Sequence, residues 1–102
     1  MMAARLARRS WRRAGRLTPP SARLRSRAMH LAPGEAVDWH STKTREELLV
    51  VLSGRLWLEW ETHGRRRTAG LEAGTTAYLP PQLRHRVRNR SRARLIYVYV
   101  TA

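Results

Sequence analysis

The chain contains no cysteine and no phenylalanine, only one lysine, and seven acidic residues among 102. Without cysteine it has neither disulfides nor thiolate metal ligands. It also lacks a long apolar run, since none approaches the ~20 residues that a membrane-spanning helix needs. We therefore expect a single cytoplasmic domain with no transmembrane segment. A domain this small buries only about 60–65% of its unfolded surface, which favours a homodimer.

Arginine is in excess, with twenty arginines against the single Lys43. Residues 1–28 hold nine of these arginines and no Asp or Glu, so they supply +9 of the formal net charge of +14. The strong basicity therefore belongs mainly to the N-terminal part of the chain. It says little about the folded part.

The basic N-terminal residues recur at spacings of three and four, which on a helix would place the arginines on one side and Leu6 and Trp11 on the other. Pro19 and Pro20 would end such a helix. A basic segment of this kind is typical of a transit peptide, a membrane-surface helix or a nucleic-acid arm, but a disordered tail is the commoner outcome. We predict a disordered or helical basic leader at residues 1–21, with organellar targeting as the minor alternative to the cytoplasm.

From residue 22 onward the apolar period becomes two, and turn signals follow at short intervals. Strands are predicted at residues 22–31, 47–53, 55–61, 66–69, 75–79, 85–89 and 95–101. The run 47–53 is mostly apolar, so we expect it to be buried on both faces. No stretch has the apolar stripe of a helix. Many short strands with close turns indicate a small all-β sandwich or barrel at residues 22–102.

Two histidines and one glutamate, His40, His85 and Glu47, lie in two stretches that are bounded by glycine, proline or other turn residues. The first stretch contains Gly34, His40, Thr42, Glu47 and Gly54, and the second contains Gly74, Pro80, Gln82, His85 and Asn89. Glu47 opens an apolar strand, where a carboxylate needs either a metal or a partner such as Arg45 or Arg84. His85 alternates with Val87 and so points inward, as a ligand or as an ordinary core histidine.

These spacings resemble the two motifs of the cupin superfamily, in which a Gly, two His, a Glu and a Gly are followed by a Gly, a Pro, a Gly, a His and an Asn. The resemblance covers about residues 22–102 and implies a cupin-like jelly-roll barrel. It also implies a divalent metal (Fe, Mn, Zn or Ni) bound by His40, Glu47 and His85. Two His and one carboxylate are the facial arrangement of non-haem Fe(II) sites. Thr42 replaces the second His of the motif and is the candidate for the fourth position, although its hydroxyl is a poor ligand.

Two functions follow from this resemblance, and the residues do not decide between an enzyme and a binding protein. One is a metal-dependent enzyme of the dioxygenase or isomerase type that acts on a small organic ligand. The other is a metal-free ligand-binding or regulatory module, which the loss of the second His at Thr42 favours. Tyr78 and Trp60 are the candidates for lining the ligand pocket.

Two further expectations concern the second stretch. Arginines occupy every second position of residues 84–94, and we expect them to form a solvated basic edge of a sheet. Because no aromatic residues interleave with them in the sequence, nucleic acid is not expected as a partner. Gln82 stands where the motif has Gly, so we expect its turn to avoid a positive φ.

Overall fold

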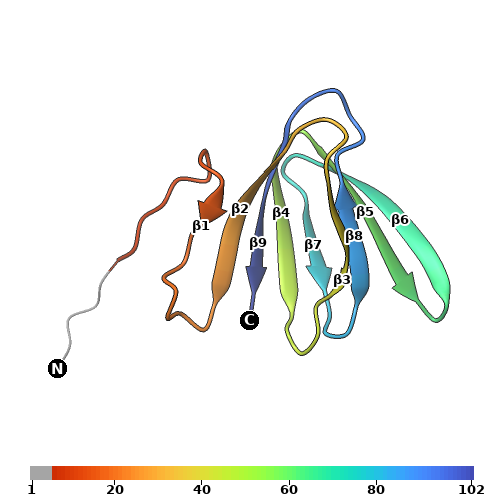
Figure 1. Cartoon of the computed structure of the whole chain (residues 1–102), viewed down its shortest axis with the longest axis horizontal. Coiled ribbons are helices and arrows are strands. Elements are labelled where there is room, and N and C mark those ends of the chain that lie inside the picture. The colour runs from red at the N-terminus through yellow and green to blue at the C-terminus, as the bar shows by residue number, and fades with distance from the viewer. Residues whose placement is uncertain (1–5) are drawn as a thin grey trace.

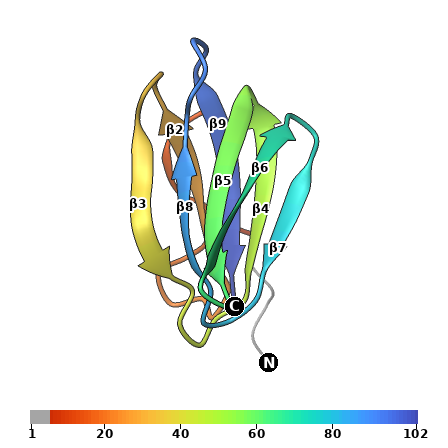
Figure 2. The same cartoon turned by 90° about the vertical axis from the view of Figure 1, so that its right-hand side faces the viewer.

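The computed structural model describes residues 6–102, and the first five residues of the predicted leader lie outside it. Two antiparallel sheets pack against each other (Figures 1 and 2). The first sheet has the order β1 (Gly15–Arg16), β2 (Arg25–Leu31), β9 (Leu95–Thr101), β4 (Glu47–Ser53) and β7 (Thr76–Leu79). The second has the order β3 (Ala36–Ser41), β8 (Arg84–Arg88), β5 (Arg55–Thr62) and β6 (Arg65–Glu72). The predicted all-β fold is confirmed.

Side chains at every second strand position fill the space between the sheets. The buried apolar residues form one cluster of Leu31, Leu49, Val51, Leu56, Leu58, Leu79, Val87, Leu95 and Tyr97. Burying one Leu or Val side chain stabilises a fold by about 1.5–3 kcal/mol, so this cluster is the main source of stability. The expectation that β4 is buried on both faces is wrong. Leu48 remains 39% exposed, because no further layer covers the outer side of this sheet in residues 6–102.

Strand β3 carries His40 and is not among the predicted strands. The reason is a β-bulge, since the register of β3 against β8 shifts between Val37 and His40. A bulge inserts an extra residue and interrupts the period of two on which the sequence prediction depends. The same bulge sets which way His40 faces relative to Val37.

The arginines of β8 do not form a sheet edge as predicted, because β8 lies between β3 and β5. On the outer face of this sheet, Arg84 and Arg86 place their guanidinium carbons 5.4 and 5.1 Å from the ring centre of Trp39. Strand β3 supplies this tryptophan, so an aromatic residue interleaves with the arginines in space although not in the sequence. The expectation that nucleic acid does not bind stays a prediction. The absence of interleaved aromatic residues no longer supports it, because Trp39 contacts the arginines.

Residues 6–21 contain no helix, so the helical alternative for the leader is wrong for this part of the chain. Instead, β1 pairs with β2, and the backbone N–H of Leu17 donates to the carbonyl of Ser26 at 2.9 Å. An isolated helix of about 15 residues is marginal in water, whereas the open edge of β2 offers unpaired backbone groups. The end of the leader therefore extends the barrel wall. Residues 6–102 also include no helix able to cross a membrane.

Gln82 has a φ of 60°, so the expectation that it avoids positive φ is wrong. Its backbone N–H donates to the carbonyl of Lys43 at 2.7 Å, which ties the β7–β8 turn to the β3–β4 loop. A non-glycine residue in this conformation costs about 1–2 kcal/mol. The hydrogen bond between the two turns offsets part of that cost.

Candidate metal and ligand site

Three strand termini meet at one end of the barrel, where β3 ends and β4 and β8 begin (Figure 1). His40 and His85 are direct partners in the register of β3 against β8, and Glu47 is the first residue of β4 in the opposite sheet. All three side chains line one cavity of about 280 Å³. Residues far apart in the sequence are thus brought together as the predicted site requires.

Both histidines have one ring nitrogen engaged with the backbone. The Nδ1 atom of His40 lies 2.8 Å from the carbonyl of Asp38, and that of His85 lies 3.0 Å from the carbonyl of Leu83. Because a carbonyl only accepts hydrogen bonds, each Nδ1 carries the proton, and the Nε2 of the neutral ring keeps a free lone pair. Metal-binding histidines are usually held in this way, with the other nitrogen donating to a carbonyl.

The Nε2 of His85 is the only buried side-chain nitrogen or oxygen in residues 6–102 that has no hydrogen-bond partner. The Oε2 of Glu47 lies 3.3 Å from it, but outside hydrogen-bonding geometry. Leaving a buried polar atom unpaired costs about 1–3 kcal/mol. Since the lone pair and the carboxylate are both acceptors, a cation or a proton between them would satisfy both.

The spacing of this pair fits two ligands of one ion. Ligands about 2.1 Å from an ion lie about 3.0 Å apart at a right angle and about 3.4 Å apart at the tetrahedral angle. The 3.3 Å between His85 and Glu47 falls within that range. As they stand, however, no three His, Asp or Glu side chains in the described part of the chain complete a metal site.

His40 is the member of the group that would have to adjust. Its ring centre lies 4.3 Å from that of His85, with the two planes inclined at 57°. His40 is exposed at the cavity mouth, whereas the His85 side chain is 1% exposed. A turn of the His40 ring would therefore displace few neighbours, although it would break the 2.8 Å bond of its Nδ1 to the carbonyl of Asp38.

Thr42 is placed differently from the three predicted ligands and does not line the cavity. Its hydroxyl donates to the carbonyl of Pro80 at 2.7 Å and accepts from the backbone N–H of Leu83 at 3.0 Å. These bonds join the end of β3 to the β7–β8 turn. The hydroxyl is therefore committed to the backbone rather than directed at His40.

Tyr78 and Trp60, the predicted pocket residues, line a different cavity of about 340 Å³ with mostly apolar walls. Tyr78 is 58% exposed, and its hydroxyl donates to the carboxylate of Glu46 at 2.6 Å. This bond raises the pKa of Tyr78. The two aromatic residues therefore line a separate cavity from the histidines, although Trp60 is the direct partner of His85 in the register of β5 against β8.

The histidine cavity is completed by residues that the sequence reasoning did not assign to it, chiefly Arg27, Met29, Tyr97 and Tyr99. Burial raises the pKa of Tyr97, and the negative charge of Glu47 adds to the effect. These residues occupy alternate, inward-facing positions of β2 and β9. Strand alternation was the available signal for these residues, but an inward-facing arginine is hard to distinguish from a surface one among twenty arginines.

Comparison with known proteins gives one family. The family model described as "Cupin domain" matches residues 27–100 of the chain. No curated protein matches. Among solved structures, a Cupin 2 conserved barrel domain protein from Salinispora arenicola is 29% identical with a TM-score of 0.71, and the match covers 99% of this chain and 87% of that one.

Two further structures share the fold at lower identity. The CENP-C domain of Drosophila melanogaster bound to CAL1 is 16% identical with a TM-score of 0.71, and the match covers 83% of this chain and 65% of that one. Oxalate decarboxylase from Bacillus subtilis is 23% identical with a TM-score of 0.70, and the match covers 76% of this chain and 20% of that one. The chain thus spans less than two thirds of either protein.

Proposed function

The chain belongs to the cupin family, and from that premise we propose that it binds a divalent metal through His40, Glu47 and His85. A small organic ligand would occupy the cavity beside the metal. A bound metal of this kind supplies a Lewis acid or a site for O₂, as in dioxygenases and isomerases. Iron, manganese, zinc and nickel all accept this set of ligands.

The observation that carries the proposal is the unpartnered Nε2 of His85 beside the carboxylate of Glu47. A histidine kept only for packing would be expected to have both ring nitrogens satisfied, because orphaned buried polar atoms are rare in folded proteins. The backbone carbonyls hold both imidazole rings in the tautomer that a metal needs. Glu47 adds the negative charge that offsets a cation.

Metal binding can be tested directly on the full chain purified without a histidine tag. We expect about one Mn²⁺, Zn²⁺, Ni²⁺ or Fe²⁺ per chain by elemental analysis after loading and dialysis. Glu47→Gln should weaken binding in a calorimetric titration by about 100-fold or more, because it removes a ligand. Glu46→Gln, which removes the exposed neighbouring carboxylate, is the matched control and should leave binding unchanged. Equal affinities for wild type and Glu47→Gln would refute the ligand assignment.

A metal-free binding module is the second candidate, and the position of Thr42 favours it. The hydroxyl that replaces the second motif histidine is bound to the backbone, so it adds no ligand. Drosophila melanogaster CENP-C, which shares this fold, is bound to CAL1 in its solved structure. Wild-type protein that retains no metal after loading would select this candidate.

A homodimer stays a prediction, and the outer face of the first sheet is the surface that suits it. Leu48 and Val100 are direct partners across β4 and β9, and so are Val50 and Val98. These apolar pairs point away from the core, and Leu48 is 39% exposed. We expect light scattering to give the dimer mass, and Leu48→Glu to give the monomer mass.

A further inference from the structure

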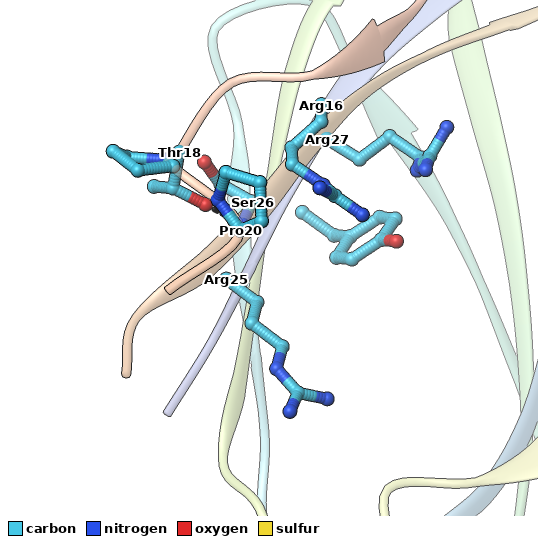
Figure 3. Close-up of a pocket in the computed structure, with 8 residues that line it drawn as sticks. Arg16, Thr18, Pro20, Arg25, Ser26 and Arg27 are labelled. Carbon is cyan, nitrogen blue, oxygen red and sulfur yellow. Dashed lines mark hydrogen bonds between the residues drawn. The ribbon is translucent and has the colours of Figure 1, made fainter. Parts of the chain in front are cut away.

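A third cavity, of about 270 Å³, lies where the N-terminal segment meets β2 (Figure 3). It is lined by Arg16, Thr18, Pro19, Pro20, Arg25, Ser26, Arg27 and Tyr99. Three of these residues are arginines and none is acidic. Arg16 and Arg27 are direct partners in the register of β1 against β2, so both side chains start from the same face of the sheet. Figure 3 shows the Arg25 side chain directed away from this pair.

The arginines of this cavity differ from those on the outer face of the second sheet. There, Arg55, Arg66, Arg84, Arg86 and Arg88 each form a salt bridge with a glutamate. In contrast, Arg16, Arg25 and Arg27 form no salt bridge with any carboxylate of residues 6–102. A guanidinium group that is not neutralised is a bidentate donor suited to a carboxylate or a phosphate.

The backbone of the N-terminal segment fixes the position of this cavity. The backbone N–H of Ser26 donates to the hydroxyl of Thr18 at 3.0 Å, and Leu17 donates to the Ser26 carbonyl at 2.9 Å. These bonds hold Arg16 beside Arg27. The segment that the sequence predicted as a separate leader therefore forms one wall of the cavity.

The arginine cavity is also connected to the histidine cavity. Arg27 and Tyr99 line both of them. The register across the sheet explains this, because Arg16, Arg27, Tyr99 and Leu49 follow one another on neighbouring strands. A ligand with its anionic end at Arg16 and Arg27 would extend past Tyr99 toward the histidines.

We propose that Arg16 and Arg27 form an oxyanion site and that the ligand of the histidine cavity is a small organic acid. The acidic group is a carboxylate or a phosphate, since both present the oxygens that a guanidinium binds. Only the second half of this proposal rests on the proposed function, because the arginines bind an anion whether or not the histidines hold a metal.

Calorimetric titration of the full chain at fixed ionic strength tests the site. The probes are inorganic phosphate and succinate, with succinamide as the uncharged counterpart of succinate. We expect at least one of the two anions to bind, and succinamide not to bind. Arg27→Met and Arg16→Met should each weaken anion binding by about tenfold or more, because each removes a charge-assisted contact.

Arg92→Met is the matched control, since it removes the same charge from an exposed position in the β8–β9 loop, away from both cavities. It should leave the affinity within about twofold of wild type, because exposed charges beyond a Debye length are largely screened. Thermal melts of all three variants establish that each is folded. If neither anion binds, or if Arg92→Met weakens binding as much as Arg27→Met does, the proposal is wrong. The tighter of the two anions identifies the acidic group.

Repeating the titration on Glu47→Gln separates this proposal from the proposed function. Anion binding that persists in Glu47→Gln and still depends on Arg27 supports the oxyanion site even if no metal is ever bound. Metal binding to wild type without anion binding would instead refute the oxyanion site alone. The dependence of the metal affinity on bound anion then tests the link between the two cavities.

Discussion

Glu47 and Glu59 are two carboxylates with little exposure on opposite sheets of one barrel, and their surroundings differ. Glu59 is 4% exposed and accepts from Arg86 at 3.0 and 3.2 Å and from Arg88 at 3.2 Å. Glu47 has an 11% exposed side chain, and its Oε2 lies 3.3 Å from the Nε2 of His85, a ring nitrogen that has no hydrogen bond.

The comparison separates a structural carboxylate from one that is available for binding. The Arg86 hydrogen bonds lower the pKa of Glu59 although burial acts in the opposite direction. Arg86 and Arg88 therefore meet the needs of Glu59 entirely within the second sheet. Glu47 and His85 are instead left with acceptor capacity at a cavity wall, and this difference supports the proposed metal site.

The largest effect on stability should come from Glu59. Glu59→Gln removes the charge that Arg86 and Arg88 share, and we expect a loss of about 2 kcal/mol in the free energy of unfolding by urea titration. Glu72→Gln is the control, because its ion pair with Arg55 is exposed and should be worth less than about 0.5 kcal/mol. Equal losses of unfolding free energy in Glu59→Gln and Glu72→Gln would contradict the structural role assigned to Glu59.

Acid should reduce the difference between Glu59→Gln and wild type. The pKa of Glu59 is lower in the folded state than its usual value of 4.5, so the folded protein binds fewer protons there than the unfolded chain. The stabilisation is present above about pH 4.5 and is lost as the pH falls through the folded-state pKa. Urea titrations of both proteins between pH 7 and pH 3 should converge at the acid end. A gap that stays constant over this range contradicts the assignment.

Thr42 belongs with Glu59 as a structural group, although its place in the motif suggested the metal site. Thr42→Val leaves the carbonyl of Pro80 and the N–H of Leu83 without their partner. We expect a loss of about 1–2 kcal/mol in the free energy of unfolding. Metal affinity, measured in the same titration as for Glu47→Gln, should not change. A tenfold fall in metal affinity would show that Thr42 contributes to metal binding.

The all-β fold could be predicted because strand alternation and turn spacing are local signals, whereas the grouping of His40, Glu47 and His85 followed from the resemblance of their motifs to those of the cupin superfamily. Strands β4 and β9 begin and end at the predicted residues. What could not be predicted depends on contacts between distant segments. The bulge in β3, the central place of β8 and the pairing of β1 with β2 are set by neighbouring strands. The role proposed for Arg27 follows from the pairing of β1 with β2.

The smallest effect, and the sharpest contrast with Glu59, should come from Glu47 in metal-free protein. Glu47→Gln replaces an acceptor by an amide whose N–H₂ can donate to the Nε2 of His85, 3.3 Å from the present carboxylate oxygen. Because the unpaired nitrogen then gains a partner, we expect the free energy of unfolding to stay level or rise by up to about 1 kcal/mol. The measurement is urea unfolding in the presence of a chelator, with Glu46→Gln as the control for lost charge. A loss of 2 kcal/mol, as expected for Glu59→Gln, would mean that Glu47 and His85 already satisfy each other as an ordinary ion pair. The pair would then be structural, and the case for a cation between them would fail.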